Sequence, residues 1–197
     1  MHRLFTALLL VGIFTLSSAT SHEKVCKNFT GKPYLNGTAF FKGTWSLTHA
    51  LIPDVPKGAP VMGICLYIKS ILSPPIVFQN YTTMLPSTGE IVYGQGIIVL
   101  KDGDSNFVSN IRLIEDGQPA SKFNPFIETI IGTDYENYAV GYFCLDVVDS
   151  MFTGTIAVLG RSSDPDKIHP DVNNVLNKIG LKLSDLVSTI RGNCPEV

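Results

Sequence analysis

The residues of this chain with the widest chemical repertoire are four cysteines, Cys26, Cys65, Cys144 and Cys194. A thiolate beside a histidine can act as a nucleophile, and clustered cysteines can hold zinc or exchange disulfides. None of the four lies in a C-x-x-C pair, the spacing expected of a redox or zinc motif. An even number of widely spaced cysteines in an exported chain instead predicts two disulfide bonds, for which three pairings are possible.

Other catalytic and metal-binding motifs are missing from the sequence. It contains no G-x-S-x-G, no H-E-x-x-H and no Gly-rich phosphate loop, which are the local signatures of common hydrolases and nucleotide enzymes. His22, His49 and His169 have no spacing typical of a metal site. Asp134 and Glu136 could form a carboxylate pair, but a structural role accounts for Asp134 below. We therefore expect a binding protein, not an enzyme, and no metal.

The first segment of the chain, residues 1–21, is typical of a secretory signal peptide. One arginine near the start precedes the apolar run Leu4–Leu16, and small residues follow it. The run is too short for a transmembrane helix. Cleavage after Ala19 and cleavage after Ser21 both fit the small-residue pattern. We therefore expect a secreted, extracellular protein in which residues 22–197 form a single domain.

The charge of the chain excludes two classes of partner. The formal net charge is −2, and no run of five basic residues occurs, so neither nucleic acid nor a membrane surface is an expected partner. Three N-x-S/T sequons, at Asn28, Asn36 and Asn80, are candidate glycosylation sites in a secreted chain. We expect a soluble monomeric glycoprotein.

The disulfides and candidate sites must be carried by short strands. Turn residues separate eight apolar, strand-like segments, a pattern typical of an up-and-down barrel or a sandwich. The segments are Gly43–Ala50, Val61–Leu72, Ile76–Leu85, Ile91–Leu100, Phe107–Ile114, Phe123–Ile131, Asn137–Val147 and Phe152–Leu159.

The sequence after these strands changes to helical spacing. Apolar residues at Val172, Val175, Leu176 and Ile179 share one helix face, and Gly180 follows as a stop signal. Ser184 is expected to cap a second short turn that runs towards Ile190.

Three short motifs occur in a fixed order along this pattern. Gly43-Thr44-Trp45, which holds the only tryptophan, opens the first strand. Thr133-Asp134-Tyr135 precedes the seventh strand, and Arg161 follows the eighth. Together, and before a helix, they resemble the motifs of a lipocalin. The resemblance implies an all-β fold, an eight-stranded antiparallel up-and-down barrel with a C-terminal α-helix, in which Arg161 packs over Trp45 and closes one end.

The cysteine positions are similar to those of the salivary lipocalins of triatomine bugs, the nitrophorin and triabin-like group. Thr48-His49 after the tryptophan motif and the tail Gly180–Val187 are similar too. This resemblance implies the disulfides Cys26–Cys144 and Cys65–Cys194.

Haem binding, which the nitrophorin resemblance raises, does not fit the sequence. Nitrophorins hold haem iron through a histidine on the strand after the second cysteine, and that place corresponds to Thr83 here. No histidine lies between His49 and His169, and strand alternation turns Met84 outward. We therefore expect no cofactor and disfavour a haem-based nitric oxide carrier.

Strand alternation predicts which residues line the barrel. Outward bridges at Cys65 and Cys144, and a glycan at Asn80, would turn alternate residues of three strands inward. A largely apolar lining with a few polar groups suits a ligand with an apolar body and one polar handle, although such residues can also fill a small barrel completely. The predicted lining is Met62, Ile64, Leu66, Ile68, Val77, Gln79, Tyr81, Thr83, Ala139, Gly141, Phe143 and Leu145.

The resemblance implies a salivary protein that sequesters a small hydrophobic or amphipathic host mediator, with anti-haemostatic and anti-platelet activity. An eicosanoid or fatty acid is favoured slightly over a biogenic amine or ADP, because carboxylates are scarce on the predicted inward faces and arginines are few. Arg112 is a speculative partner for a ligand carboxylate. The alternative is a triabin-like inhibitor of a host clotting protease that uses the loops Leu51–Pro56 and Ser73–Ile76.

Overall fold

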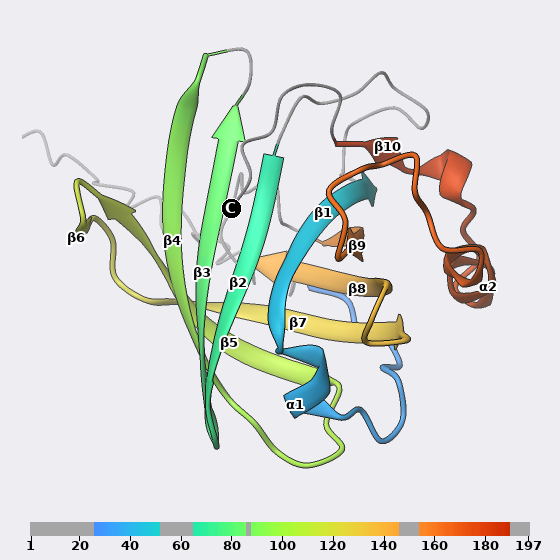
Figure 1. Ribbon diagram of the computed structural model, residues 1–197. Coiled ribbons are helices and arrows are strands. Elements are labelled where there is room, and N and C mark those ends of the chain that lie inside the picture. Colours follow the sequence, from blue (N-terminus) through green and yellow to red (C-terminus); the bar gives the residue numbers. More distant parts are fainter. Residues whose placement is uncertain (1–25, 52–64, 86–87, 146–153, 190–197) are drawn as a thin grey trace, which may run out of the picture.

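The computed structural model describes residues 26–51, 65–85, 88–145 and 154–189, so the predicted signal peptide lies outside the described residues. Eight antiparallel strands form a barrel (Figure 1) in which neighbours along the chain pair and β1 also pairs with β9. The strands are β1 (Gly43–Leu51), β2 (Cys65–Ser73), β3 (Ile76–Leu85), β4 (Glu90–Val99), β5 (Asn106–Glu115), β7 (Asn124–Thr133), β8 (Tyr138–Leu145) and β9 (Thr155–Gly160). The predicted eight-stranded lipocalin barrel is confirmed.

Three short elements have no counterpart in the sequence-based prediction. A helical turn, α1 (Gly37–Phe40), precedes the first strand; β6 (Gln118–Pro119) pairs with β5, and β10 (Val187–Ser188) pairs with β1. Segments of two to four residues are too short to show a hydrophobic period. Asn36 caps α1 because its Oδ1 accepts a hydrogen bond from the backbone nitrogen of Ala39 at 3.0 Å.

The barrel wall separates two apolar cores, because strand residues alternate between its faces. The inner core gathers residues such as Trp45, Ile68 and Phe143 from around the barrel. The outer core lies between β8, β9 and the C-terminal helix, and includes Val140 and Leu176. Figure 1 shows α2 (Asp171–Lys178) against the side of the barrel opposite β4.

Helix α2 begins and ends as its sequence predicts. Val172, Val175 and Leu176 are its buried residues. At its end Gly180 takes a φ of 75°, and the backbone nitrogen of Leu181 donates to the carbonyl of Leu176 at 3.0 Å, which is the Schellman arrangement that favours glycine.

The second short turn differs from the prediction that Ser184 caps it. It is a 3₁₀ turn, Leu183–Asp185, with Ser184 inside it. Asp185 closes the turn through its Oδ2, which accepts from the backbone nitrogen of Lys182 at 3.0 Å. No helix within the described residues is long and apolar enough to cross a membrane.

A disulfide joins Cys26 to Cys144, and so ties the segment before α1 to the outside of β8. This confirms one of the two bridges that the resemblance implies. Cys65 is disulfide-bonded as well. Its implied partner, Cys194, lies outside the described residues, so that pairing stays a prediction.

Candidate ligand-binding site

One end of the barrel is closed by Arg161, as the lipocalin resemblance implies. Its guanidinium lies 3.5 Å from the centroid of the Trp45 ring. The same group donates to the carbonyl oxygens of Thr44 at 2.9 Å, Tyr135 at 3.0 Å and Phe40 at 3.2 Å. Burial lowers the pKa of Arg161 to about 10, so the side chain remains a cation at neutral pH. This end of the barrel is therefore plugged.

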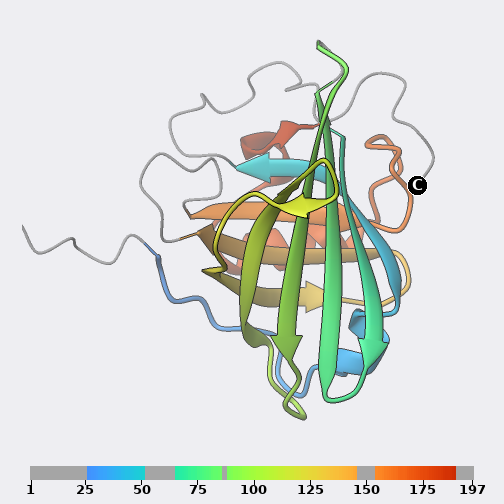
Figure 2. The same cartoon turned by 90° about the vertical axis from the view of Figure 1, so that its left-hand side faces the viewer.

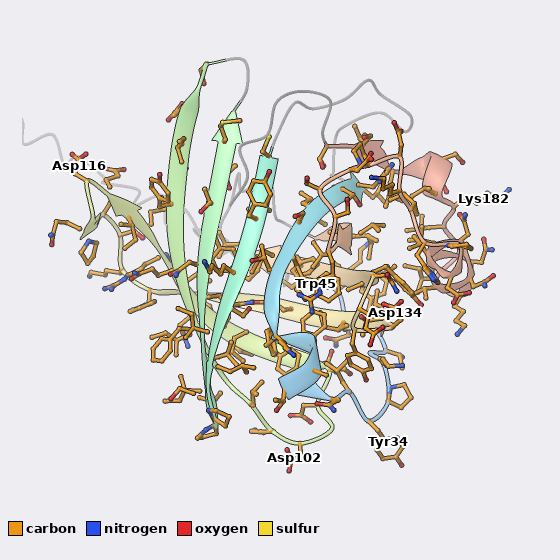
Figure 3. All side chains as sticks on the ribbon, in the orientation of Figure 1. Tyr34, Trp45, Asp102, Asp116, Asp134 and Lys182 are labelled. Atoms are coloured by element: carbon orange, nitrogen blue, oxygen red, sulfur yellow. A yellow bond between two sulfur atoms is a disulfide. The ribbon has the colours of Figure 1, made fainter. Side chains whose placement is uncertain are left out.

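The turn between β7 and β8 presents one of these carbonyls. Asp134, labelled at the turn in Figure 3, accepts hydrogen bonds through Oδ1 from the backbone nitrogens of Asn137 at 2.8 Å and Tyr138 at 3.0 Å. Burial opposes these bonds, but they prevail and lower the pKa of Asp134. The turn holds Tyr135 at a φ of 71°, from where its carbonyl reaches Arg161. Asp134 is thus explained as a turn residue and not as half of a catalytic pair.

A cluster of polar side chains lies inside the barrel, among inward-facing residues that are mostly apolar. We call Gln79, Tyr81, Ser109 and Glu128 the interior polar cluster. The Tyr81 hydroxyl lies 2.6 Å from Oε1 of Gln79 and 3.2 Å from Oε1 of Glu128. Glu128 is 2% exposed, and Ser109, whose side chain acts on the pKa of Glu128, is fully buried. The barrel therefore encloses a carboxylate surrounded by neutral groups.

Two glycines on β4 make room for this cluster. Gly94 lies opposite Tyr81 and Gly96 opposite Gln79 in the pairing of β3 with β4. A Cβ on Gly96 would come within 3.0 Å of the Tyr81 ring and 3.2 Å of its hydroxyl. The ring therefore lies over glycine backbone, and its hydroxyl reaches across the interior to β7. On the other side, Phe126 meets the Tyr81 ring edge-on with centroids 6.5 Å apart.

The environment of Glu128 favours its protonated form. Burial raises its pKa from 4.5 to about 7, while the nearby side chains of Ser109, Tyr81 and Gln79 act in the opposite direction. Burial and the neighbouring Glu128 together raise the pKa of Tyr81 well above its ordinary value. Near neutral pH the carboxyl group is therefore balanced between its two forms, and an added cation would favour the charged one.

The described residues of the predicted lining face the interior. Leu66, Ile68 and Val77 belong to the inner core, as do Ala139 and Phe143. Gln79, Tyr81 and Thr83 alternate on the same side of β3 as Val77, and Gly141 and Leu145 share the side of Phe143 on β8. Met62 and Ile64 lie outside the described residues.

Arg112 does not face the interior. It lies on the outer side of β5, where its guanidinium stands over the Phe123 ring at 4.7 Å and its Nη2 donates to Oε1 of Gln95 at 2.9 Å. The speculative role of Arg112 as a partner for a ligand carboxylate inside the barrel is therefore wrong. This outward position agrees with strand alternation, since Ser109 on the same strand faces inward.

Glu128 was not recognised as an interior residue from the sequence. It lies in the predicted strand Phe123–Ile131, which contains no cysteine or sequon to show which alternate residues face inward. Alternation alone does not decide the face, because Ile127, Thr129 and Ile131 form an equally apolar alternate set, and Ile127 and Ile131 pack against the outer core.

The loops proposed for binding a protease lie apart from this cluster. Ser73–Ile76 joins β2 to β3 at the end of the barrel that Arg161 closes, since Ser70 pairs with Gly43 at the start of β1. Of Leu51–Pro56, only Leu51 is described. The clotting-protease alternative stays a prediction.

The interior residues that the structure describes offer no histidine to a haem iron. Of the described histidines, His49 pairs with Val158 of the outer core, and His169 stacks on Tyr138 at 5.1 Å. Both therefore lie outside the barrel wall. Thr83, which the resemblance puts at the place of the haem-ligating histidine, lies on the inward side of β3. Tyr81 could bind iron only as a phenolate, and burial beside Glu128 disfavours that form.

The three sequons lie in different settings. Asn28 is exposed near the Cys26–Cys144 bridge, Asn36 is the cap of α1, and Asn80 is exposed on the outer side of β3. The outward position of Asn80 agrees with the orientation that was assumed for β3.

Comparisons with known proteins give one family and several structural relatives. The family model described as Nitrophorin matches residues 26–196. The tryptamine complex of the amine-binding protein of Rhodnius prolixus is similar at a TM-score of 0.71 and 21% identity, over 83% of this chain and 85% of that chain. A biogenic amine-binding protein gives 0.69 and 20%, over 82% and 84%. A mutant of LTBP1 in complex with leukotriene C4 gives 0.53 and 20%, over 80% and 88%. No curated protein matches significantly.

At these identities the structural likenesses show the lipocalin fold alone. The family model goes further, because it spans nearly all of the chain after the predicted signal peptide. The barrel plugged by Arg161 and Trp45 and the Cys26–Cys144 bridge agree with it. This chain belongs to the nitrophorin family.

Proposed function

We propose that this protein is a secreted binding protein that holds, inside its barrel, a small ligand with an apolar body and a protonated amine. The observation that carries the proposal is Glu128, a carboxylate that is 2% exposed within an apolar interior. Within the described part of the chain, no Lys, Arg or His is among the groups that shift its pKa. The ligand would supply the missing cation.

The energetic reason is the cost of an isolated buried charge. A carboxylate taken out of water is strongly destabilised unless a cation or several donors compensate it. Glu128 has the Tyr81 hydroxyl within 3.2 Å, which compensates only part of this cost. An ammonium group would pair with the carboxylate. Its remaining N–H groups would meet the oxygen of Gln79 and the hydroxyl of Ser109.

The apolar part of such a ligand has suitable neighbours. Leu66, Ile68, Phe126 and Phe143 surround the interior polar cluster in the inner core. The rings of Phe126 and Phe143 stack with their centroids 6.1 Å apart. Aromatic and aliphatic surfaces of this kind suit an aromatic or alkyl amine.

The interior polar cluster changes the preference among ligand classes. The sequence favours an eicosanoid or fatty acid slightly, because carboxylates are scarce on the predicted inward faces, and it leaves Arg112 as a speculative partner. With Glu128 inside and Arg112 outside, a ligand carboxylate would meet a like charge. The amines in the names of two structural relatives have the chemistry that Glu128 requires. Sequestering such a mediator in saliva would produce the anti-haemostatic effect that the resemblance implies.

The test compares three indole ligands with different polar groups on a short side chain: tryptamine, tryptophol and indole-3-acetate, titrated calorimetrically at pH 8. We expect tryptamine to bind about 30-fold more tightly than the alcohol, since a charge-assisted hydrogen bond contributes about 2 kcal/mol. The acid should bind most weakly. Glu128→Gln should abolish the preference for the amine, whereas Glu115→Gln, at an exposed carboxylate, should keep it.

The pH dependence gives a second readout. Below the pKa of about 7 the amine must displace a proton from Glu128, so its affinity should fall about tenfold for each pH unit. The Glu128→Gln variant should show no such slope. Tighter binding of indole-3-acetate or of an arachidonate-derived lipid would overturn the amine proposal in favour of an acid. Silence towards all of these ligands, with inhibition of a clotting protease, would support the triabin-like alternative.

A further inference from the structure

The outer side of four neighbouring strands carries many exposed apolar side chains, on both sides of a polar row formed by Lys69, Asn80, Gln95 and Arg112. We call the outward residues of β2, β3, β4 and β5 the outer face. Figure 2 shows these four strands side by side, with α2 on the far side of the barrel. In the strand register, Ile71 lies beside Phe78 and Phe78 beside Ile97, while Ile76 lies beside Val99. Direct cross-strand neighbours of this kind touch one another.

The outer face is unusually apolar for a surface in water. Its large exposed apolar side chains are Ile71 (52% exposed), Ile76 (36%), Phe78 (42%), Ile91 (44%), Tyr93 (47%), Val99 (59%) and Val108 (60%). The outward positions of these four strands include Lys69 and Arg112 but no Asp or Glu. Soluble monomers rarely expose groups of large apolar side chains side by side.

Asn80 lies in the middle of this surface. It is exposed, and its neighbours across the strands are Lys69 and Gln95. Phe78, Asn80 and Thr82 alternate along β3, so the ring, the acceptor amide and the sequon hydroxyl project from the same side, each about 7 Å from the next. We propose that Asn80 carries an N-linked glycan that covers the outer face.

The glycan suits this surface chemically. The first sugar attached to Asn80 would lie within reach of the Phe78 ring, and the C–H face of a sugar packs well on an aromatic ring. The rest of the glycan would bring hydroxyl groups over side chains that otherwise contact water. The proposal depends on passage through the secretory pathway and is independent of the ligand, because Asn80 points away from the interior polar cluster.

The modification is a group transfer. The Nδ2 of Asn80 attacks the anomeric carbon of an oligosaccharide carried by a polyprenyl diphosphate, the donor of the secretory pathway. The new bond joins nitrogen to that carbon, and the bond from the carbon to the diphosphate oxygen breaks. The amide loses one proton, and the lipid diphosphate leaves with the electron pair. No electrons are exchanged with an oxidant or reductant.

The other two sequons do not share this setting. Asn36 uses its Oδ1 to cap α1, and Asn28 lies in an irregular segment where Phe29 packs on Tyr142 with centroids 4.7 Å apart. Neither lies on the outer face. Asn28 is therefore the matched control: an exposed sequon whose glycan, if attached, would cover no apolar surface.

The experiment expresses the full chain in secreting insect cells and maps glycan occupancy by peptide mass spectrometry. We expect occupancy at Asn80. Asn80→Gln and Thr82→Ala both remove the sequon, and the second keeps the Asn80 amide. Both should raise the fluorescence of an apolar-surface dye several-fold and cause self-association in sedimentation velocity. Asn28→Gln should behave like the unmodified sequence.

Two further samples, a deglycosylated protein and a double variant, test whether loss of the glycan itself exposes the outer face. If the variants fail to fold, enzymatic removal of the glycan from the secreted, folded protein should produce the same dye binding and self-association. Adding Phe78→Ser to Asn80→Gln should restore the monomer, because it makes the outer face more polar. An unmodified Asn80, or a monomer with unchanged dye binding after the glycan is lost, would overturn the proposal. Tryptamine affinity should be the same in all these samples, so failure here is distinct from failure of the proposed function.

Discussion

The closed end and the interior polar cluster each bury an ionisable side chain, but they treat its charge differently. Arg161 has carbonyl acceptors on three residues and the face of an indole ring. Its pKa falls only to about 10. Glu128 has only the neutral side chains of Ser109, Tyr81 and Gln79 around it, and burial raises its pKa to about 7. The charge of Arg161 is fully compensated by its neighbours, whereas the charge of Glu128 is only partly compensated.

This difference separates a structural site from a binding site. A charge that the protein itself satisfies rigidifies the fold and requires no ligand. A charge that remains poorly solvated lowers the stability of the free protein and is satisfied when a ligand of opposite charge arrives. The plug at the closed end is thus complete in the free protein, whereas the proposed ligand would complete the interior polar cluster.

The largest expected loss of stability comes from a substitution of Arg161, which closes the end of the barrel. Replacing Arg161 with Met leaves the carbonyls of Thr44 and Tyr135 without their charged donor and removes the contact with Trp45. We expect a loss of about 3–5 kcal/mol in the free energy of unfolding, from several charge-assisted hydrogen bonds and a cation–π contact. Urea unfolding measures it. Arg112→Met, on the outer face, is the control and should cost less than about 1 kcal/mol; equal losses would refute the distinction.

The next effect tests the uncompensated charge through the pH dependence of stability. The folded pKa of Glu128, about 7, lies above its ordinary value of 4.5, so the folded state binds the proton more tightly. Stability is therefore fully present below pH 4.5 and is lost as the pH rises through 7. The loss is on the order of 3 kcal/mol.

Glu128→Gln should remove this loss. Compared with the variant, the unmodified protein should become about 3 kcal/mol less stable between pH 4 and pH 8, measured without ligand by chemical unfolding at each pH. Parallel pH profiles for the two proteins would show that Glu128 is already compensated in the free barrel.

A smaller effect tests the support of the interior polar cluster. Gly96→Ala places a Cβ 3.0 Å from the Tyr81 ring, so the ring must shift away from Gln79 and Glu128. We expect a cost of about 1–2 kcal/mol in stability, the usual range for an overpacked core, together with weaker tryptamine binding. The control is Gly94→Ala, where the nearest atom is 3.4 Å away. It should be tolerated better, and the reverse ranking would contradict the assigned packing.

The smallest expected effect is a change in the pKa of Glu128 when the Tyr81 hydroxyl is removed. Tyr81 acts to lower the pKa of Glu128, so Tyr81→Phe should raise that pKa further, by less than about one unit. The measurement is the free energy of unfolding of the Tyr81→Phe protein and of the Tyr81→Phe, Glu128→Gln double variant as a function of pH. The pH at which half of the difference between them has developed reports the pKa of Glu128. A midpoint that moves to lower pH would show that Tyr81 does not stabilise the carboxylate.

The sequence predicted two kinds of feature: those marked by a short motif, and those on strands where a cysteine or a sequon must face outward. The order of Trp45, Asp134 and Arg161 led to the barrel and its plug. Cys65, Cys144 and Asn80 each marked one outward position, and alternation then gave the correct inner faces of β2, β8 and β3. These predictions depend on local spacing, which a single sequence shows directly.

Glu128 required information that local spacing does not contain. No covalent landmark lies on β7, and a β-bulge between Ile130 and Gly132 interrupts its alternation. The contact of Tyr81 with Glu128 joins residues 47 positions apart and depends on glycines of a third strand. The short elements α1, β6 and β10 were missed because pairing and capping, more than periodicity, create them.

The closure of the barrel has a consequence for how the chain folds. Strand β1 uses one edge for β9, from Ser46 with Gly160 to Leu51 with Ile156, and His49 and Ala50 pair with β10 as well. On the opposite edge of β1, beside β10, Thr189 donates to the carbonyls of Thr48 and Leu47, each at 2.9 Å. Partners so distant along the chain cannot meet until nearly all of it has been synthesised. One edge of β1 therefore stays unpaired during synthesis. The slow formation of long-range contacts then controls the rate of folding.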